Sequence, residues 1–219
     1  MTVRAAFFDW GHTLFDTPGS VEFIVDWSAR HGTPLDAEQA GVLWEHARRR
    51  SRTPEQMAKG RDLSAAVHRE CWTALWAPLD ELAPGIANAL HGFETSAAGW
   101  APYVDTREVL EELHNRGIPV VVVSDVPFDL RPIFAHYGLG HLVHTYVLSG
   151  EHGSVKPELR LFRIALDAVG VRAEEAVMVG DNHTNDGAAV EVGIRTLLLP
   201  HVAHGEPRGL WAAVDLIDS

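Results

Sequence analysis

The segment that says most about the architecture is Arg4-Ala-Ala-Phe-Phe-Asp9-Trp-Gly-His-Thr-Leu-Phe-Asp16. The apolar run from Val3 to Phe8 has the length of a buried strand, and it ends abruptly in the carboxylate of Asp9. In open α/β sheets, ligands bind where the carboxyl ends of the strands stop and the loops diverge. We therefore expect Asp9 to lie at the ligand-binding edge of such a sheet.

Length and composition predict a globular protein. With 219 residues, of which 46% are hydrophobic, the chain can bury one substantial core, or a core plus a smaller insertion. Its apolar runs are shorter than the ~20 residues of a membrane span, and its start lacks the pattern of a secretory leader. The single cysteine, Cys71, fits a reducing compartment. We therefore expect a cytoplasmic protein that does not associate with membranes.

The net charge of −12 argues against nucleic acid as a partner, because a protein that binds the nucleic-acid backbone needs an excess of Lys and Arg. An anionic small molecule would need local help from a cation or a metal ion. Lys59 and Lys156 are the two lysines of the chain, so their positions are informative. The oligomeric state stays open.

The chain changes from strand to helix patterns after Phe15. Amphipathic spacing and breaks at Gly and Pro predict helices over Val21–Arg30, Asp36–Arg50, Leu63–Trp76 and Glu81–Leu90, followed by a linker over Gly92–Pro102. Four such helices with short breaks indicate a small bundle. We predict an all-α domain at residues 18–99.

From Tyr103 onwards helices and strands alternate. The predicted strands are Ile118–Val123, Leu142–Leu148, Ala176–Val179 and Ile194–Leu199, and the predicted helices are Thr106–Asn115, Asp129–Tyr137, Glu158–Val169 and Asp186–Val192. This alternation is typical of parallel βαβ units in a doubly wound sheet. We therefore predict an α/β core made of residues 1–17 and 100–219, with the helical bundle inserted after its first strand.

Three further strand ends carry polar groups. Ser124 follows four valines, Lys156 precedes a proline, and Gly180-Asp181 ends a strand five residues before Asp186 opens a helix. Two carboxylates near one site repel each other unless a hard cation neutralises them, and Mg²⁺ prefers such oxygen ligands. The sequence therefore predicts a magnesium site at the edge where Asp9 lies.

The order Asp-x-x-x-Thr-Leu, apolar strand with Ser, Lys-Pro, and Gly-Asp-x-x-x-Asn-Asp resembles the haloacid dehalogenase superfamily of aspartate-nucleophile hydrolases. This resemblance implies a Rossmann-like core with a mobile helical cap and a reaction through an aspartyl-phosphate at Asp9. It further implies that Thr13 orients the nucleophile and that Ser124 and Lys156 bind the transferring group. The implied magnesium ligands are Asp9, Asp181, Asp186 and the backbone carbonyl of Gly11.

The sequence departs from this family pattern at two neighbouring positions, Gly11 and His12, the second of which is usually a glycine. Phosphatases of the superfamily usually carry a second aspartate two residues after the nucleophile, where this chain has Gly11 followed by His12. General acid–base catalysis is typically worth ~10²–10⁴ in rate. His12 and His183 are the candidates for moving the proton, because histidine titrates near neutrality. His12 is also a candidate substrate-binding residue.

The sequence favours a magnesium-dependent phosphatase of an anionic small molecule but leaves alternatives. A phosphonoacetaldehyde-hydrolase-like enzyme would use a Schiff-base lysine, for which Lys59 is the candidate. A 2-haloacid dehalogenase works without metal. The presence of Asp181 and Asp186 argues against this alternative, because these two residues are the predicted metal ligands. A ligand-binding protein with little turnover has no use for a nucleophile. The run Arg48–Arg52 contacts an anionic substrate or forms a solvated helix face.

Overall fold

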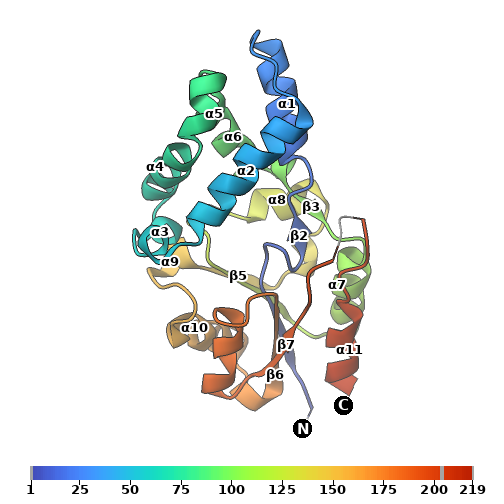
Figure 1. Cartoon of the computed structure of the whole chain (residues 1–219). Coiled ribbons are helices and arrows are strands. Elements are labelled where there is room, and N and C mark those ends of the chain that lie inside the picture. The colour runs from blue at the N-terminus through green and yellow to red at the C-terminus, as the bar shows by residue number, and fades with distance from the viewer. Residues whose placement is uncertain (1, 203–204, 219) are drawn as a thin grey trace. The chain divides into compact units, whose positions relative to one another are not determined.

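The computed structural model describes residues 2–202 and 205–218 of the chain (Figure 1). The chain forms two compact units. One consists of Met1–Asp16 and Ala101–Ser219, here called the sheet unit, and the other is Thr17–Trp100, here called the helical unit. These boundaries lie one residue from those predicted by the change from strand to helix patterns.

The sheet unit contains a five-stranded parallel sheet among its described residues. The order is β5-β4-β1-β6-β7, with β1 at Ala5–Phe8, β4 at Val120–Ser124, β5 at Thr145–Leu148, β6 at Ala176–Gly180 and β7 at Arg195–Leu198. In the centre, Phe8 of β1 pairs with Val122 of β4 and Val179 of β6. The predicted doubly wound α/β fold is confirmed, and β1 is the central strand of the sheet.

Helices cover both faces of this sheet because its strands are apolar on both sides. Helix α10 (Leu159–Val169) packs on β4 and β5, whereas α7 (Thr106–Asn115) packs on β4 and α11 (Trp211–Asp218) on β6. Phe7 and Val121 share a buried cluster with Leu161 and Phe162 of α10. Burial of each large apolar side chain contributes about 1.5–3 kcal/mol.

The remaining elements of the sheet unit are short. They are α8 (Arg131–His136), α9 (Ser149–His152), the 3₁₀ turns η3 (Gly140–Leu142) and η4 (Ala173–Glu175), and the 3₁₀ helix η5 (Asp186–Val192). The predicted helix at residues 186–192 is present with the predicted bounds, and it is a 3₁₀ helix. Gly187, Ala188 and Ala189 have short side chains, which allow this segment to wind tightly against β6 and β7.

A two-stranded antiparallel pair stands where the helical unit leaves and rejoins the sheet unit. Strand β2 (Phe15–Asp16) pairs with β3 (Ala101–Pro102). The predicted linker at Gly92–Pro102 was wrong in part, because α6 continues to Glu94 and the turn η2 (Ala97–Gly99) follows. Two-residue strands leave no periodic pattern in the sequence, so the pair was missed.

The helical unit contains α1 (Ser20–Arg30), α2 (Ala37–Ser51), α3 (Pro54–Met57), η1 (Arg61–Leu63), α4 (Ala65–Leu75), α5 (Ala77–Leu82) and α6 (Ile86–Glu94). Ile24, Leu75, Leu79 and Leu90 belong to its buried core. Trp72 and Trp76 stack on each other with ring centroids 5.1 Å apart, and both are buried in this core. These two indole rings therefore serve the packing of the unit.

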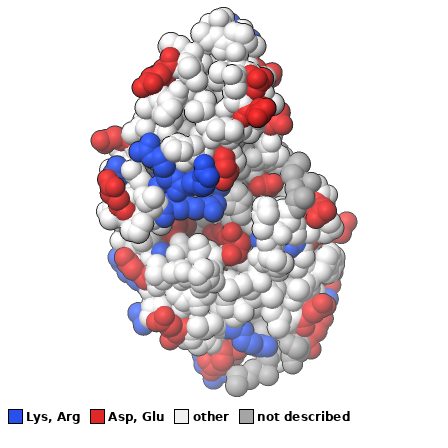
Figure 2. Space-filling view, viewed as in Figure 1, with Lys and Arg blue, Asp and Glu red and all other residues white. Residues whose placement is uncertain are grey.

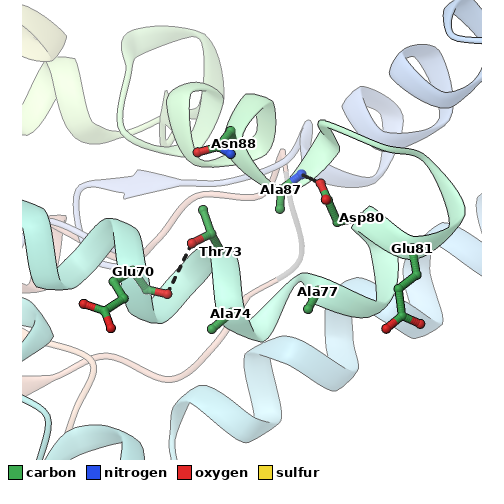
Figure 3. Close-up of a pocket in the computed structure, with 8 residues that line it drawn as sticks. All are labelled: Glu70, Thr73, Ala74, Ala77, Asp80, Glu81, Ala87 and Asn88. Carbon is green, nitrogen blue, oxygen red and sulfur yellow. Dashed lines mark hydrogen bonds between the residues drawn. The ribbon is translucent and has the colours of Figure 1, made fainter.

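The prediction of one helix over residues 81–90 was wrong in part, because the chain breaks between α5 and α6. Pro84 cannot donate a backbone hydrogen bond, and Gly85 has a φ of 94°. Asp80 Oδ1 accepts the N–H groups of Gly85 and Ala87 at 3.0 Å each, which satisfies the start of α6 (Figure 3). The groove beside this turn also has Glu70 and Glu81 among its lining residues, so its charge disfavours an anionic ligand.

In the described ranges, 2–202 and 205–218, none of the helices has both the length and the apolar character required to cross a membrane.

Two histidines of the helical unit predict how its stability depends on pH. His68 Nδ1 lies 3.1 Å from Nε2 of the buried His91. Burial, helped by His91 and Arg61, lowers the pKa of His68 from 6.5 to about 3. As the pH falls below 6.5, the unfolded chain binds a proton that the folded chain excludes, so the free energy of unfolding falls between pH 6.5 and about 3.

We therefore expect His68→Gln to flatten this acid loss of stability. The amide keeps a hydrogen-bonding group beside His91 but takes up no proton. Urea unfolding at several pH values between 7 and 4 measures the effect, and the exposed His46→Gln is the control. An equal pH dependence in wild type and His68→Gln would contradict the assignment.

Candidate active site

Asp9 sits directly after β1, between the ends of two neighbouring strands. Its N–H donates to Val179 O at 2.9 Å, which continues the pairing with β6. Ser124 closes β4 on the other side, and its hydroxyl donates to Asp9 Oδ1 at 3.3 Å. Asp9 is only 8% exposed. The central strand therefore delivers a buried carboxylate to the carboxyl edge of the sheet, as the sequence predicts.

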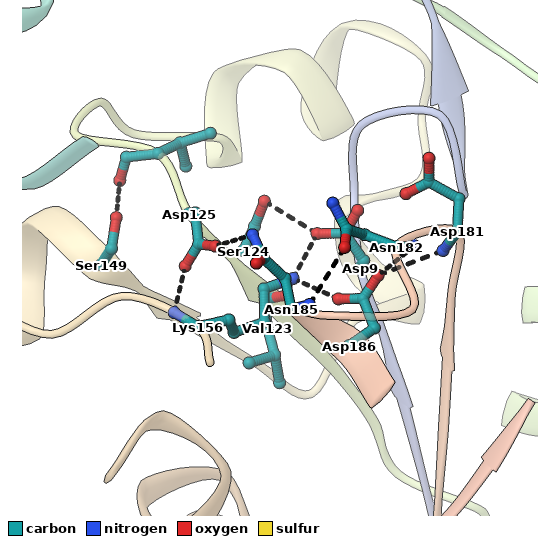
Figure 4. Close-up of polar contacts among 11 residues, drawn as sticks. Asp9, Val123, Ser124, Asp125, Ser149, Lys156, Asp181, Asn182, Asn185 and Asp186 are labelled. Atoms are coloured by element: carbon teal, nitrogen blue, oxygen red, sulfur yellow. Dashed lines mark hydrogen bonds and ion pairs between the residues drawn. The ribbon is translucent and has the colours of Figure 1, made fainter. Parts of the chain in front are cut away.

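Lys156 joins three segments of the site (Figure 4). Its ammonium donates to Asp9 Oδ1 at 2.8 Å, to Asp186 Oδ1 at 2.6 Å and to Val123 O at 3.1 Å. Burial alone would lower the pKa of Lys156, but the charges of Asp186 and Asp9 outweigh it and raise that pKa above its usual value. Lys156 therefore carries its positive charge in the core of the site.

Asp186 is held by backbone as well as by Lys156. Its Oδ2 accepts the N–H groups of Asp181 at 3.1 Å and Asn182 at 3.0 Å, and the residue is 1% exposed. This arrangement needs a glycine at position 180, because a Cβ on Gly180 would overlap the Asp186 carboxylate. The Gly-Asp motif thus combines a close backbone approach with two carboxylates.

Three carboxylates converge on one point of the site. Asp9, Asp181 and Asp186 each offer an oxygen within 4.8 Å of the others. Burial raises the pKa of Asp9 to about 7; Asp186 and Asp181 add to this rise, while Lys156 opposes it. One ammonium therefore does not balance the negative charge. Hard oxygen donors with excess negative charge are suited to Mg²⁺, so these residues fit the ion that the sequence predicts.

The other predicted site residues lie close by along the chain. Thr13 is fully buried, and its hydroxyl makes no hydrogen bond within the described residues, so its orienting role stays a prediction. Gly11 forms an isolated bridge with Phe15, and its role as a metal ligand also stays a prediction. His12 has a φ of 59°, and its Nδ1 lies 3.4 Å from Asp16 Oδ1. His183 is exposed.

Two supporting residues were missed from the sequence. Asp125 accepts the Lys156 N–H at 2.8 Å and the Asn185 side-chain amide at 3.2 Å. A second polar residue directly after Ser124 was the available signal. Arg208 donates to the His12 carbonyl at 2.7 Å, while its own N–H donates to Asp105. Its distance of 196 residues from His12 leaves no local pattern to read.

Fold and site together define an α/β enzyme with a buried, carboxylate-lined centre suited to a divalent cation. A model of the haloacid dehalogenase-like hydrolase family matches residues 3–193. The chain belongs to this family, as the resemblance of the four motifs predicts.

Individual relatives match parts of the chain. It is 41% identical over 85 residues to a phosphoserine phosphatase of Thermus thermophilus, covering 38% of this chain and 34% of that protein. It is 32% identical over 124 residues to a ribulose-1,5-bisphosphate 5-phosphatase of Halopiger xanaduensis, covering 52% and 50%. The matched regions thus span half or less of these relatives.

A solved structure resembles the whole chain. The L-2-haloacid dehalogenase RSc1362 superposes with a TM-score of 0.75, 19% identity and full coverage of both chains. At this identity the similarity shows the fold alone.

Gly180→Ala tests the close approach at the Asp186 carboxylate. The new methyl group must displace this carboxylate and break its bond to Lys156, so we expect a folded protein with at least about tenfold lower hydrolase activity. Circular dichroism and steady-state rates measure the two effects. Gly187→Ala is the matched control, since a Cβ there meets no atom within 4 Å. Equal rates for both variants would contradict this account.

Proposed function

We propose that the protein is a magnesium-dependent phosphatase that hydrolyses phosphate esters of small molecules with Asp9 as nucleophile. The observation that carries the proposal is the placement of the buried Asp9 carboxylate 2.8 Å from the Lys156 ammonium and within 4.8 Å of Asp181 and Asp186. A nucleophilic acid, a buried cation and a set of metal ligands at one sheet edge suit attack on an anionic group.

The attack must overcome repulsion between a carboxylate and a phosphoryl dianion. Lys156 and Ser124 both bond Asp9 Oδ1, so we assign the attack to Oδ2. Asp9, Asp181 and Asp186, together with the Gly11 carbonyl, would hold Mg²⁺. When bound, this ion supplies positive charge that lowers the repulsion. Lys156 supplies a second positive charge, and the Ser124 hydroxyl offers a hydrogen-bond donor to the transferring group.

The reaction then proceeds in two displacements. In the first, a bond forms between Asp9 Oδ2 and phosphorus while the bond from phosphorus to the ester oxygen breaks, and the alcohol leaves with a proton. In the second, water attacks the aspartyl-phosphate, which releases inorganic phosphate and restores Asp9. Both steps need a general acid or base, first to protonate the leaving alcohol and then to take a proton from the attacking water.

Phosphate is favoured over the alternative substrates by several observations. The curated relatives named above are phosphatases by name. A Schiff-base lysine needs a desolvated environment, but Lys59 is exposed in the helical unit. The convergence of three carboxylates on one point favours an enzyme that uses a divalent cation over a metal-independent dehalogenase.

Substrate turnover with and without magnesium tests the proposal. Wild-type protein should release phosphate from aryl and acyl phosphates with Mg²⁺ and lose this activity in EDTA. Asp9→Asn should lower kcat by at least about 10³-fold, whereas Asp167→Asn, at an exposed position on α10, should leave it unchanged. Metal-independent chloride release from chloroacetate, or turnover of phosphonoacetaldehyde that Lys59→Ala abolishes, would overturn it.

We further infer that His12 is the general acid and base of the reaction. It would replace the second aspartate of the family, at whose position this chain has Gly11, a residue without a side chain. The contact of His12 with Asp16 orients its ring in the loop that follows the nucleophile. His12→Gln should slow hydrolysis of alkyl phosphates by ~10²–10⁴ but affect acyl phosphates little, because their leaving group needs no proton. Adding Gly11→Asp to His12→Gln should restore the rate. His183→Gln, at an exposed position, is the control. A His12→Gln variant that slows alkyl and acyl phosphates equally would contradict the role of His12 in proton transfer.

A further inference from the structure

Arg208 is the least exposed arginine among the residues that the structure describes, with only 2% of its surface open to solvent. Lys and Arg side chains ordinarily keep their charge in water, as those visible on the face of the molecule in Figure 2 do. A guanidinium is expensive to bury unless its N–H groups find acceptors. The sheet unit therefore holds this charge inside at a cost, which indicates a specific role for it.

The guanidinium of Arg208 bonds three backbone carbonyls. Nε donates to the carbonyl of His12 at 2.7 Å, Nη2 donates to that of Leu199 at 3.2 Å, and Nη1 donates to that of Pro200. The group also lies over the Tyr103 ring, 5.6 Å from the ring centroid. All three nitrogen atoms thus donate to the backbone, so this side chain fixes the segments that surround it.

These carbonyls belong to two segments at the carboxyl edge of the sheet. His12 lies in the loop that follows Asp9, whereas Leu199 directly follows β7. The Leu199 N–H donates to the Gly180 carbonyl at 2.9 Å, so the end of β7 is itself tied to the end of β6. Arg208 therefore links the loop after the proposed nucleophile to the strand ends that carry the Gly-Asp motif.

The backbone of Arg208 is fixed independently of its side chain. Asp105, which is 5% exposed, accepts the Arg208 N–H at 2.9 Å through Oδ1. Its Oδ2 accepts the N–H groups of Gly209 at 2.8 Å and Leu210 at 2.9 Å. These bonds hold the segment before α11 against the start of α7 and use backbone donors only. Replacement of the Arg208 side chain therefore leaves them intact.

The backbone at His12 depends on support from outside the loop. Its φ of 59° lies in the left-handed region, which a residue with a side chain occupies only where the surrounding structure holds it there. The His12 N–H donates to the Phe15 carbonyl at 2.6 Å, and the His12 carbonyl accepts the bond from Arg208. Arg208 thus supplies one of the two backbone bonds that keep His12 in this conformation.

The other end of the loop is held by a different element. The Leu14 carbonyl accepts the Thr106 hydroxyl at 2.8 Å and the Tyr103 N–H at 3.1 Å. These bonds fix the loop next to β2 and do not involve the Arg208 side chain. Loss of the guanidinium should therefore release the backbone around His12 while β2 stays in place.

We propose that Arg208 is a positioning residue that holds His12 in its left-handed conformation and thereby keeps the imidazole Nδ1 beside Asp16, 3.4 Å from Oδ1. Its effect on turnover rests on the proposed role of His12 in proton transfer, whereas its effect on the loop does not. A proton moves only between groups within hydrogen-bond reach, so a small displacement of the ring slows the reaction strongly.

Amide hydrogen exchange of the full chain, followed by NMR, tests the loop without a substrate. Arg208→Met should raise the exchange rates of the His12 and Thr13 amides at least about tenfold and leave those of β4 unchanged. Arg116→Met is the matched control, because Arg116 also joins α7 to α11 but bonds Glu112 and Asp218. Unchanged rates at His12 and Thr13, or an equal rise in β4, overturn the proposal.

Arg208→Lys decides this test if Arg208→Met does not fold. The variant keeps the positive charge, but an ammonium lacks the fixed fork of a guanidinium and cannot bond all three carbonyls in the same way. We expect it to raise exchange at His12 and Thr13 at least about threefold. Rates equal to those of the wild type would overturn the proposal.

A double-mutant cycle with His12→Gln tests the catalytic part. With an alkyl phosphate and Mg²⁺, Arg208→Met should lower kcat at least about tenfold and leave KM within about twofold, and Arg116→Met should change neither. In the His12→Gln background, Arg208→Met should lower kcat less than about twofold, because the positioned ring is gone. Equal losses in both backgrounds overturn the proposal. A wild type without phosphatase activity would refute the proposed function, while the exchange rates would still decide whether Arg208 holds the loop.

Discussion

The buried ammonium of Lys156 is the interaction on which the site depends. It bonds Asp9 after β1, Asp186 at the start of η5 and the Val123 carbonyl of β4, so it joins three segments that the sequence keeps far apart. Removing such charges from water is expensive, and their mutual attraction offsets this cost only when geometry and further hydrogen bonds are good. Here the backbone N–H groups at Asp181 and Asn182 and the Ser124 hydroxyl supply those bonds.

The same interaction explains why a further cation fits the site. Lys156 offers one positive charge to a centre at which three carboxylates converge. Burial raises the pKa of Asp9 towards neutrality despite its ion pair with Lys156, and the charges of Asp186 and Asp181 add to the rise. The protein thus holds the Asp9 carboxylate in a place where its ionised form needs a nearby positive charge, and Asp181 and Asp186 offer further oxygen atoms to a cation there.

Much of this site could be predicted from sequence because Asp9, Ser124 and the Gly180-Asp181 pair stand at the ends of strands. The four valines before Ser124 and the apolar run before Asp9 identify buried strands, and parallel strands bring their carboxyl ends to one edge. The contact of Arg208 with the His12 carbonyl could not be predicted, because tertiary packing alone brings these residues together. Pro84-Gly85 is a turn signal in the sequence. Apolar residues at helical spacing on both sides of this pair nevertheless led to the prediction of one continuous helix where the structure has α5 and α6.

The pairing of β2 with β3 has a consequence for how the chain tolerates change. Phe15 faces Pro102 and Asp16 faces Ala101, so residues 17–100 depart and return at one point, as the loop of a β-hairpin does. The entropy of closing a flexible loop grows only with the logarithm of its length, at about 0.6 kcal/mol for each doubling. The helical insertion therefore acts as one long loop between two paired strands. Its length and sequence can change in evolution while the register of the parallel strands stays the same.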